Sequence, residues 1–302
     1  MGLLAFSIVV WGCTPRVTAV AAPFSHPLTL TMLRAAPAAF VLLAALPFLR
    51  AHLPRARTEW VWTAVTGLLM VTVFLAGLTE AVIKAGPGNA IVLVSTAPFF
   101  VVVCGRVFLG QWVSLRVVAG LVVGFVGVTL IVSSQLGSGS GGGTLAAGML
   151  LALAAAVAWA AGTLMIKELV VRRPSVDLVG VTAGQYLIGG LALVALSFGA
   201  EGTGGTNWSS GTLWWAVAFL AIVGSALATV TYFGALRKIS ATEATAWAFL
   251  SPVVAVVLEI VLGHAPTLIV LIGMAITIAG VAIVSAAPRT GGRLDLAPAQ
   301  SE

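Results

Sequence analysis

The chain has 302 residues, of which 60% are hydrophobic and 8% are charged, and its mean hydropathy is +1.13. Soluble globular domains carry about 25% charged residues, so this composition excludes a soluble enzyme and indicates a membrane protein. The net charge of +6 lies mostly in loops between apolar stretches and indicates no nucleic-acid partner.

Ten apolar stretches follow one another, each long enough to cross a lipid bilayer as a helix. They cover residues 3–22, 28–49, 60–83, 88–109, 115–134, 145–166, 178–199, 212–236, 242–262 and 266–286. The first is kept as a helix, since no basic segment precedes it and Arg16 interrupts it. We therefore predict an all-α membrane protein with ten transmembrane helices.

Twelve of the 15 lysines and arginines fall on one side of these spans, and only Lys84 lies in a loop on the other side. Positively charged loops remain in the cytoplasm. We therefore expect a multi-pass protein of a bacterial inner (plasma) membrane with both termini cytoplasmic.

Two segments, Ala81–Ser133 and Ala235–Ser285, share one pattern. Each begins Ala-x-x-Lys, has a proline 14 residues after the lysine, and continues with a Leu-Gly pair and two spaced glycines. An internal repeat made of apolar helices is typical of secondary transporters.

A Gly/Ser-rich linker, 135–144, separates five spans from five. Because five is odd, the second half must enter the membrane upside down, which gives two inverted repeats around a central cavity. The predicted organisation is a first repeat over 1–134, a second over 145–286 and a cytoplasmic tail over 287–302.

Pro98 and Pro252 occupy equivalent positions inside the fourth and ninth spans. A proline lacks the backbone N–H and frees the carbonyl four residues earlier, here of Val94 and Ala248. We interpret the pair as hinges beside a site; plain packing kinks are the alternative.

Charged side chains within a bilayer are costly and are candidates for function. Arg34 is the first candidate, with Gln185 as its counterpart in the second half; Arg34, Arg16 and Glu80 together could form an ion-pair network around an outward opening. The alternative is that both arginines extend to the headgroups and that Glu80 pairs with Lys84 one turn later.

Asn89 and Glu243 each lie five residues after a repeat lysine. We place Asn89 in the cavity and consider Glu80 and Glu243 as titratable groups that couple transport to an ion. However, Ser240-x-x-Glu243 also has the pattern of a capping box at the start of the ninth helix, and this interpretation is preferred.

Trp11 and Trp159 lie near the middle of the first and sixth spans, the first span of each half. Thr14 shares a helix face with Trp11, and Tyr232 and Trp247 are aromatic residues of the eighth and ninth spans. Such a polar and aromatic stripe predicts a cavity wall, with aromatic packing between helices as an equal alternative.

The sequence has no phosphate-binding loop ending in Gly-Lys, no His-Glu-x-x-His and no pair of carboxylates placed for catalysis. We expect no enzyme activity, no metal and no cofactor. A channel would need a continuous polar lining, which the few scattered polar residues do not provide.

At this point the chain resembles the drug/metabolite transporter superfamily, in its ten-helix EamA-type branch. The residues that carry the resemblance are Trp11-Gly12, Pro27 to Arg34, Ala81-x-x-Lys84-x-Gly86, Pro98 to Leu109-Gly110, Trp159, Ala235 to Lys238, Pro252 and Leu262-Gly263. The resemblance implies a cavity lined mainly by the first, third, fourth, sixth, eighth and ninth helices, with the fifth and tenth peripheral. It also implies export of small metabolites by alternating access, with amino-acid exporters of the YddG type as the best match.

The expected partners are the lipid bilayer and a small-molecule substrate, an amino acid or a similar metabolite, with the protein acting as a monomer or a homodimer. The alternatives are a multidrug or nucleotide-sugar exporter of the same fold and, from another class, a facilitative channel.

Overall fold

The computed structural model describes residues 2–133, 143–202, 204–261, 263 and 265–287. In this part of the chain all regular elements are helices. Nine helical stretches are long and apolar enough to cross a membrane, and the shorter apolar helix Leu115–Ile131 is the tenth. The prediction of an all-α fold with ten membrane helices is confirmed.

The first half forms five spans that are divided into shorter elements. These are α1 (Gly2–Ala21) with η1 (Ala22–Phe24), α2 (Pro27–Ala45), α3 (Arg57–Gly67) with η2 (Leu68–Val73) and α4 (Phe74–Ala85), α5 (Pro87–Val94) with α6 (Ala97–Leu109), and α7 (Leu115–Ile131). Gly86 and Gly110 have φ of 82° and 62°, a conformation in which a side chain would be strained. They end α4 and α6, and the chain turns back there.

The second half repeats this division. Its elements are α8 (Gly143–Arg172), α9 (Leu178–Ala200), α10 (Gly211–Ala218) with η4 (Phe219–Leu227) and α11 (Ala228–Leu236), α12 (Ala241–Ala246) with η5 (Trp247–Phe249) and α13 (Leu250–Val261), and α14 (Leu268–Ser285). Asp177 begins α9, since its carboxylate accepts the N–H groups of Val179 and Gly180.

Two predicted boundaries touch residues outside the described part of the chain. Of the predicted linker, 135–142 lie outside it, whereas 143 and 144 already belong to α8. Of the predicted tail, 288–302 lie outside the described residues.

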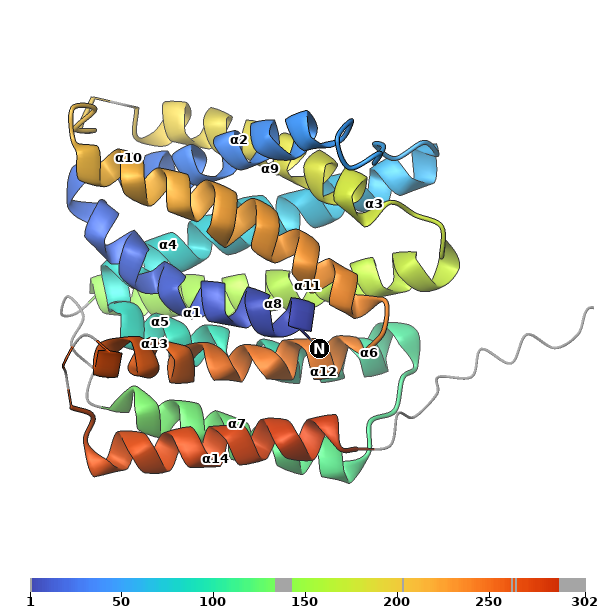
Figure 1. Cartoon of the computed structure of the whole chain (residues 1–302), viewed down its shortest axis with the longest axis vertical. Helices are drawn as coiled ribbons and strands as arrows, with labels where there is room; N and C mark the ends of the chain where they lie inside the picture. The colour runs from blue at the N-terminus through green and yellow to red at the C-terminus, as the bar shows by residue number, and fades with distance from the viewer. Residues whose placement is uncertain (1, 134–142, 203, 262, 264, 288–302) are drawn as a thin grey trace, which may run out of the picture.

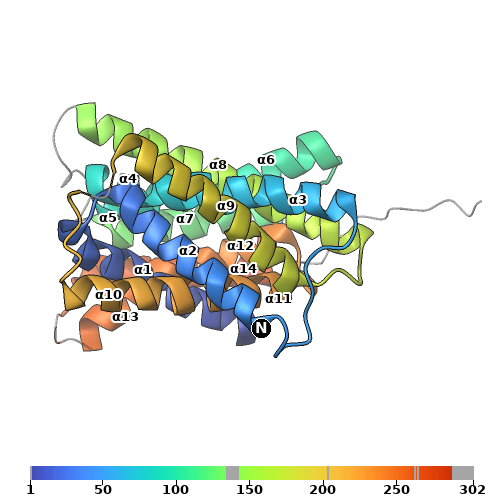
Figure 2. The ribbon, with the colours of Figure 1, turned by 90° about the horizontal axis from the view of Figure 1, so that it is seen from above.

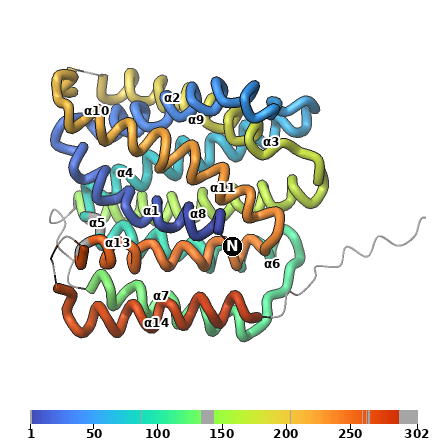
Figure 3. The backbone as a smooth tube through the Cα atoms, viewed as in Figure 1, coloured from blue at the N-terminus to red at the C-terminus, as the bar shows by residue number. Residues whose placement is uncertain are grey.

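The helices lie side by side in layers (Figure 1). At one end α2 packs on α9, and at the opposite end α7 packs on α14, as the tube also shows (Figure 3). Seen from above, α6 and α8 lie on one side of the molecule and α10 and α13 on the other (Figure 2). The α2–α9 pair and the α7–α14 pair therefore form the two ends of the bundle, with the other six spans between them.

The α7–α14 pair is joined through glycines. A Cβ added at Gly120 would lie 2.9 Å from side-chain carbons of Ile283 and Val284, and one at Gly273 would lie 2.9 Å from the carbonyl oxygen of Gly127. Small residues let helix backbones approach closely in lipid, where van der Waals packing holds helices together.

Four central spans are interrupted, and the interruptions match between the halves. Lys84 and Lys238 are 154 residues apart. The same offset carries the π-helical segment η2 (Leu68–Val73) onto the last six residues of the π-helical segment η4 (Phe219–Leu227). It also carries the gap between α5 and α6, residues 95 and 96, onto Phe249 and Leu250, where η5 ends and α13 begins. Single π-turns often mark functional sites.

The prolines lie just after the second pair of interruptions. Pro98 is in the first turn of α6, and Pro252 is in the first turn of α13. A proline is tolerated there because its missing N–H would have had no helical partner. The Ala248 carbonyl lies in the tight turn of η5, and its predicted release by Pro252 stays a prediction.

Candidate functional site

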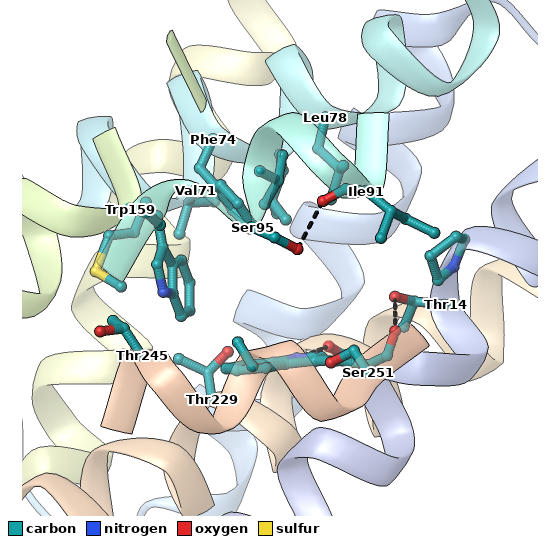
Figure 4. Close-up of a pocket in the computed structure, with 18 of the residues that line it drawn as sticks. Thr14, Val71, Phe74, Leu78, Ile91, Ser95, Trp159, Thr229, Thr245 and Ser251 are labelled. Carbon is teal, nitrogen blue, oxygen red and sulfur yellow. Dashed lines mark hydrogen bonds between the residues drawn. The ribbon is translucent and has the colours of Figure 1, made fainter. Parts of the chain in front are cut away.

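A cavity of about 120 Å³ lies in the middle of the bundle. Its lining comes from α1, α2, α8 and α9 and from the four interrupted spans. In Figure 4, labelled side chains from the two halves face one another across it: Val71, Phe74, Leu78, Ile91 and Ser95 on one side, and Thr229, Thr245 and Ser251 on the other. The cavity therefore lies between the two halves.

The lining agrees with the six helices that the resemblance implied and adds two more. The second and seventh spans also contribute, through Arg34 and through Gln185 and Tyr186. Among the described residues, α7 and α14 contribute none to the lining. These two helices pack on each other at one end of the bundle and are therefore peripheral, as the resemblance implied.

Seven of the predicted residues line this cavity. They are Trp11, Thr14, Arg34, Trp159 and Gln185 and the two prolines, Pro98 and Pro252. They come from six different spans, so that only the packed bundle brings them together. Thr14 donates its hydroxyl hydrogen to the Trp11 carbonyl at 2.9 Å, which leaves its methyl group beside Gly224.

Arg34 is 6% exposed and is the charged residue of the lining. Its Nε donates to Ser225 Oγ at 2.7 Å, and its Nη2 donates to the Gly224 carbonyl at 3.2 Å. Both acceptors belong to the π-helical segment η4. The predicted extension of this side chain to the headgroups does not occur, because the guanidinium turns inward and joins α2 to η4.

The aromatic residues form one continuous cluster at the cavity wall. The rings of Trp11 and Trp159 meet edge to face with centroids 5.1 Å apart, and the Phe74 ring lies 4.6 Å from that of Trp159. The Tyr232 ring contacts both tryptophans, with centroid distances of 5.1 Å to Trp11 and 5.3 Å to Trp159, and Tyr232 is fully buried. Tyr232 therefore supports the wall and does not itself line the cavity.

Trp11 also has a polar role, since its Nε1 donates to the Gly224 carbonyl at 3.1 Å. That carbonyl thus accepts from both Trp11 and Arg34. Gln185 directs its amide nitrogen away from the centre, to Thr66 Oγ1 at 2.6 Å. The described hydrogen bonds fix the orientation of all three lining side chains.

Three predicted residues lie outside the lining, and each has a partner elsewhere in the bundle. Glu80 forms an ion pair with Lys84 at 2.9 Å, and Asn89 donates to the Ala85 carbonyl at 2.6 Å. Trp247 donates from Nε1 to Ser285 Oγ at 3.0 Å. Among the described residues Glu80 does not pair with Arg34, so this part of the predicted network of Arg16, Arg34 and Glu80 is not formed.

Glu243 lies at the start of α12, where Ser240 Oγ accepts its backbone N–H at 3.0 Å. This is the serine half of the predicted capping box. The Glu243 side chain is 5% exposed and does not line the cavity. A coupling role for Glu243 or Glu80 stays a prediction.

The sequence analysis missed the small polar groups of the lining. Ser95, Thr229, Thr245 and Ser251 contribute hydroxyl groups, and Ser225 holds Arg34. Ser and Thr are common in membrane helices, where their hydroxyls bond to carbonyls of the preceding turn, as Ser95 does to Ile91. The signal that could have identified them is their position in the sequence, close to the interrupted segments that the two halves share.

Several known proteins are similar to this chain. It is 29% identical to the uncharacterized transporter YvbV of Bacillus subtilis, over 94% of this chain and 90% of that protein. It is 32% identical to the uncharacterized inner membrane transporter YedA of Escherichia coli K12, over 87% of this chain and 82% of the relative. A riboflavin transporter of Rhizobium johnstonii is 34% identical over 52% of this chain and 51% of its own length.

The fold also occurs in a solved crystal structure of a protein that is 22% identical, with a TM-score of 0.76 and coverage of 94% of this chain and 95% of the other. The model of the EamA-like transporter family matches residues 1–133 and 146–286, one match for each half. The cavity is thus the centre of a membrane transporter, and the chain belongs to the EamA-like transporter family.

Proposed function

We propose that this protein is a secondary transporter that exports small metabolites, amino acids first among them, across the inner membrane by alternating access. The observation that carries the proposal is the central cavity between the two halves, which contains one buried cation against an aromatic and apolar wall. Such a cavity suits a small molecule with one anionic group and a largely apolar body.

Alternating access requires a site that opens to one side at a time. The matched interruptions support it, because η2 and η4, the gap between α5 and α6, and η5 all border the cavity. A helix segment can tilt at such a break while its other half stays packed. The α7–α14 pair lies outside the cavity and suits a static frame.

The excess of basic residues on one side favours an orientation with both termini in the cytoplasm, as does the inner-membrane name of the Escherichia coli relative. We propose that the protein acts as a monomer or a homodimer; each chain holds its own site.

The test is counterflow in proteoliposomes that are loaded with single unlabelled amino acids from a full panel, with one radiolabelled amino acid outside. Trp159→Ala removes a cavity wall, whereas Trp215→Ala removes a tryptophan that is 59% exposed. We expect saturable counterflow that Trp159→Ala abolishes and Trp215→Ala preserves. Its absence for all amino acids in folded protein would contradict the proposal.

A second candidate substrate is a neutral heteroaromatic compound of the riboflavin kind, the substrate named for the relative that matches about half of this chain. The aromatic cluster of Trp11, Phe74 and Trp159 favours it, since flat rings stack on such walls. Riboflavin belongs in the same panel, and its counterflow without that of amino acids would select this candidate.

A further inference from the structure

The cavity contains a positive charge that the described protein does not neutralise. Arg34 is 6% exposed, and no carboxylate of the described residues lies within ion-pair distance of its guanidinium. Glu80, the carboxylate that the sequence suggested as a partner of Arg34, pairs with Lys84 instead. A buried cation without a counter-ion is costly in a membrane protein, and such residues mark substrate pathways.

The hydrogen bonds of Arg34 orient the guanidinium and leave part of it open. Nε and one N–H of Nη2 donate to Ser225 Oγ and the Gly224 carbonyl, both from η4. In the described part of the chain, Nη1 makes no hydrogen bond. A guanidinium has five N–H groups, so Nη1 and the second N–H of Nη2 remain as a planar fork.

A planar fork of this kind matches the two oxygens of a carboxylate. The surroundings favour the same ligand, because the lining near Arg34 offers hydroxyls, aromatic rings and aliphatic side chains, and none of the lining residues is acidic. An ammonium group would find no carboxylate there. A single negative charge would be stabilised by Arg34, because the attraction between opposite charges is stronger beside a wall of low polarity.

We infer that Arg34 binds the carboxylate of the transported molecule through Nη1 and Nη2, and that the protein therefore selects substrates by one carboxylate attached to an apolar body. This rests on the proposed function and specifies its substrate class. The carboxylate is required, whereas an α-ammonium group is tolerated and not required. Ser225 is a positioning residue that aims the guanidinium.

The alternative is that Arg34 only connects α2 to η4. Four compounds of nearly equal size separate the two interpretations in the unmodified protein: L-leucine, L-leucinamide, 4-methylpentanoate and 3-methylbutylamine. Each is tested as a competitor of radiolabelled leucine in counterflow and as a ligand by the change in tryptophan fluorescence, to which Trp11 and Trp159 in the cavity contribute.

We expect leucine and 4-methylpentanoate to bind, and the amide and the amine to bind at least tenfold more weakly, about 1.4 kcal/mol. Equal binding of acid and amide would overturn the inference and leave transport standing. Binding of none of the four would also overturn it for this cavity. Loss of counterflow for every amino acid of the panel would instead contradict the proposed function.

Variants provide the second measurement. Arg34→Gln keeps hydrogen bonding but removes the charge, and Arg106→Gln is the matched control, because Arg106 lies over the exposed Trp112 ring outside the cavity. We expect Arg34→Gln to remove the preference for acid over amide and Arg106→Gln to keep it. Ser225→Ala should weaken the binding of the acids without changing that of the amide. An unchanged preference in folded Arg34→Gln would overturn the inference.

Discussion

Replacing Gly127 by alanine should separate α7 from α14. An added methyl group would lie 2.7 Å from the Gly273 carbonyl oxygen and closer still to the backbone nitrogen and Oγ1 of Thr277. Ordinary van der Waals contact begins at 3.4 Å, so the two helices must move apart by more than 0.7 Å at this point. No flexible side chain can yield, because two of the three neighbours are backbone atoms.

The expected cost follows from these contacts. Overpacking costs about 1–3 kcal/mol, and a clash with backbone belongs at the upper end of that range. Alanine is better than glycine within a helix by about 0.5–1 kcal/mol, which offsets part of the cost. We therefore expect a net destabilisation of about 2 kcal/mol.

The assay is reversible unfolding of the purified protein in mixed micelles with increasing dodecyl sulfate. Gly199→Ala is the matched control, since Gly199 lies in α9 and a Cβ there meets nothing within 4 Å. It should leave stability unchanged or slightly raised. Because α7 and α14 do not line the cavity, the folded fraction of Gly127→Ala should keep its apparent substrate affinity. Unchanged stability of Gly127→Ala, or equal losses in both variants, would refute the reasoning.

Three further substitutions test other parts of the description. Glu80→Gln removes an ion pair with the partly exposed Lys84 and should change stability by less than about 0.5 kcal/mol; loss of counterflow in this variant would instead support a coupling role. Asp177→Ala removes the N-cap of α9 and should cost about 1–2 kcal/mol in the same unfolding assay, and a smaller cost would show that water replaces the cap. Gly12→Ala places a methyl group 2.7 Å from the carbonyl of Ser251, a cavity residue, and should lower both stability and counterflow rate; normal transport would mean that α1 and α13 part there during the cycle.

The number and class of the helices were predictable because long apolar runs with few charges admit one solution in a bilayer. The repeat was predictable for a related reason: its glycines and prolines occupy positions where a side chain or an N–H would interfere. Gly120 and Gly273 at the α7–α14 contact are examples.

The π-helical segments could not be predicted from the sequence. Leu68–Val73 and Phe219–Leu227 are apolar except for Thr72 and Ser225 and contain no proline, so that no local signal distinguishes them from α-helix. Their geometry depends on neighbours: the Thr72 hydroxyl donates to the Gly189 carbonyl, and Gly224 accepts from two side chains. Such contacts exist only after the bundle has packed.

Polarity inside a span identified part of the cavity and misassigned the rest. It located Arg34, Trp11 and Gln185, which have partners on other helices. Polarity alone did not distinguish these three residues from Glu80 and Asn89, each of which has a partner four residues away in the sequence. Whether a polar side chain points into the bundle or bonds to a neighbouring residue depends on the rotation of its helix about its axis. The sequence does not reveal this rotation when the helix is apolar on every face.

For the site to form, the number of residues in the π-helical segment η4 matters more than the identity of its aliphatic side chains. Deleting one residue from a helix turns everything beyond it by about 100° and shifts it by about 1.5 Å. A deletion between Gly224 and Leu227 would therefore move Thr229 off the cavity wall while Gly224 kept its place. Substitutions among the aliphatic residues of this segment should be mild, whereas insertions and deletions of a single residue should separate the two ends of the site from each other.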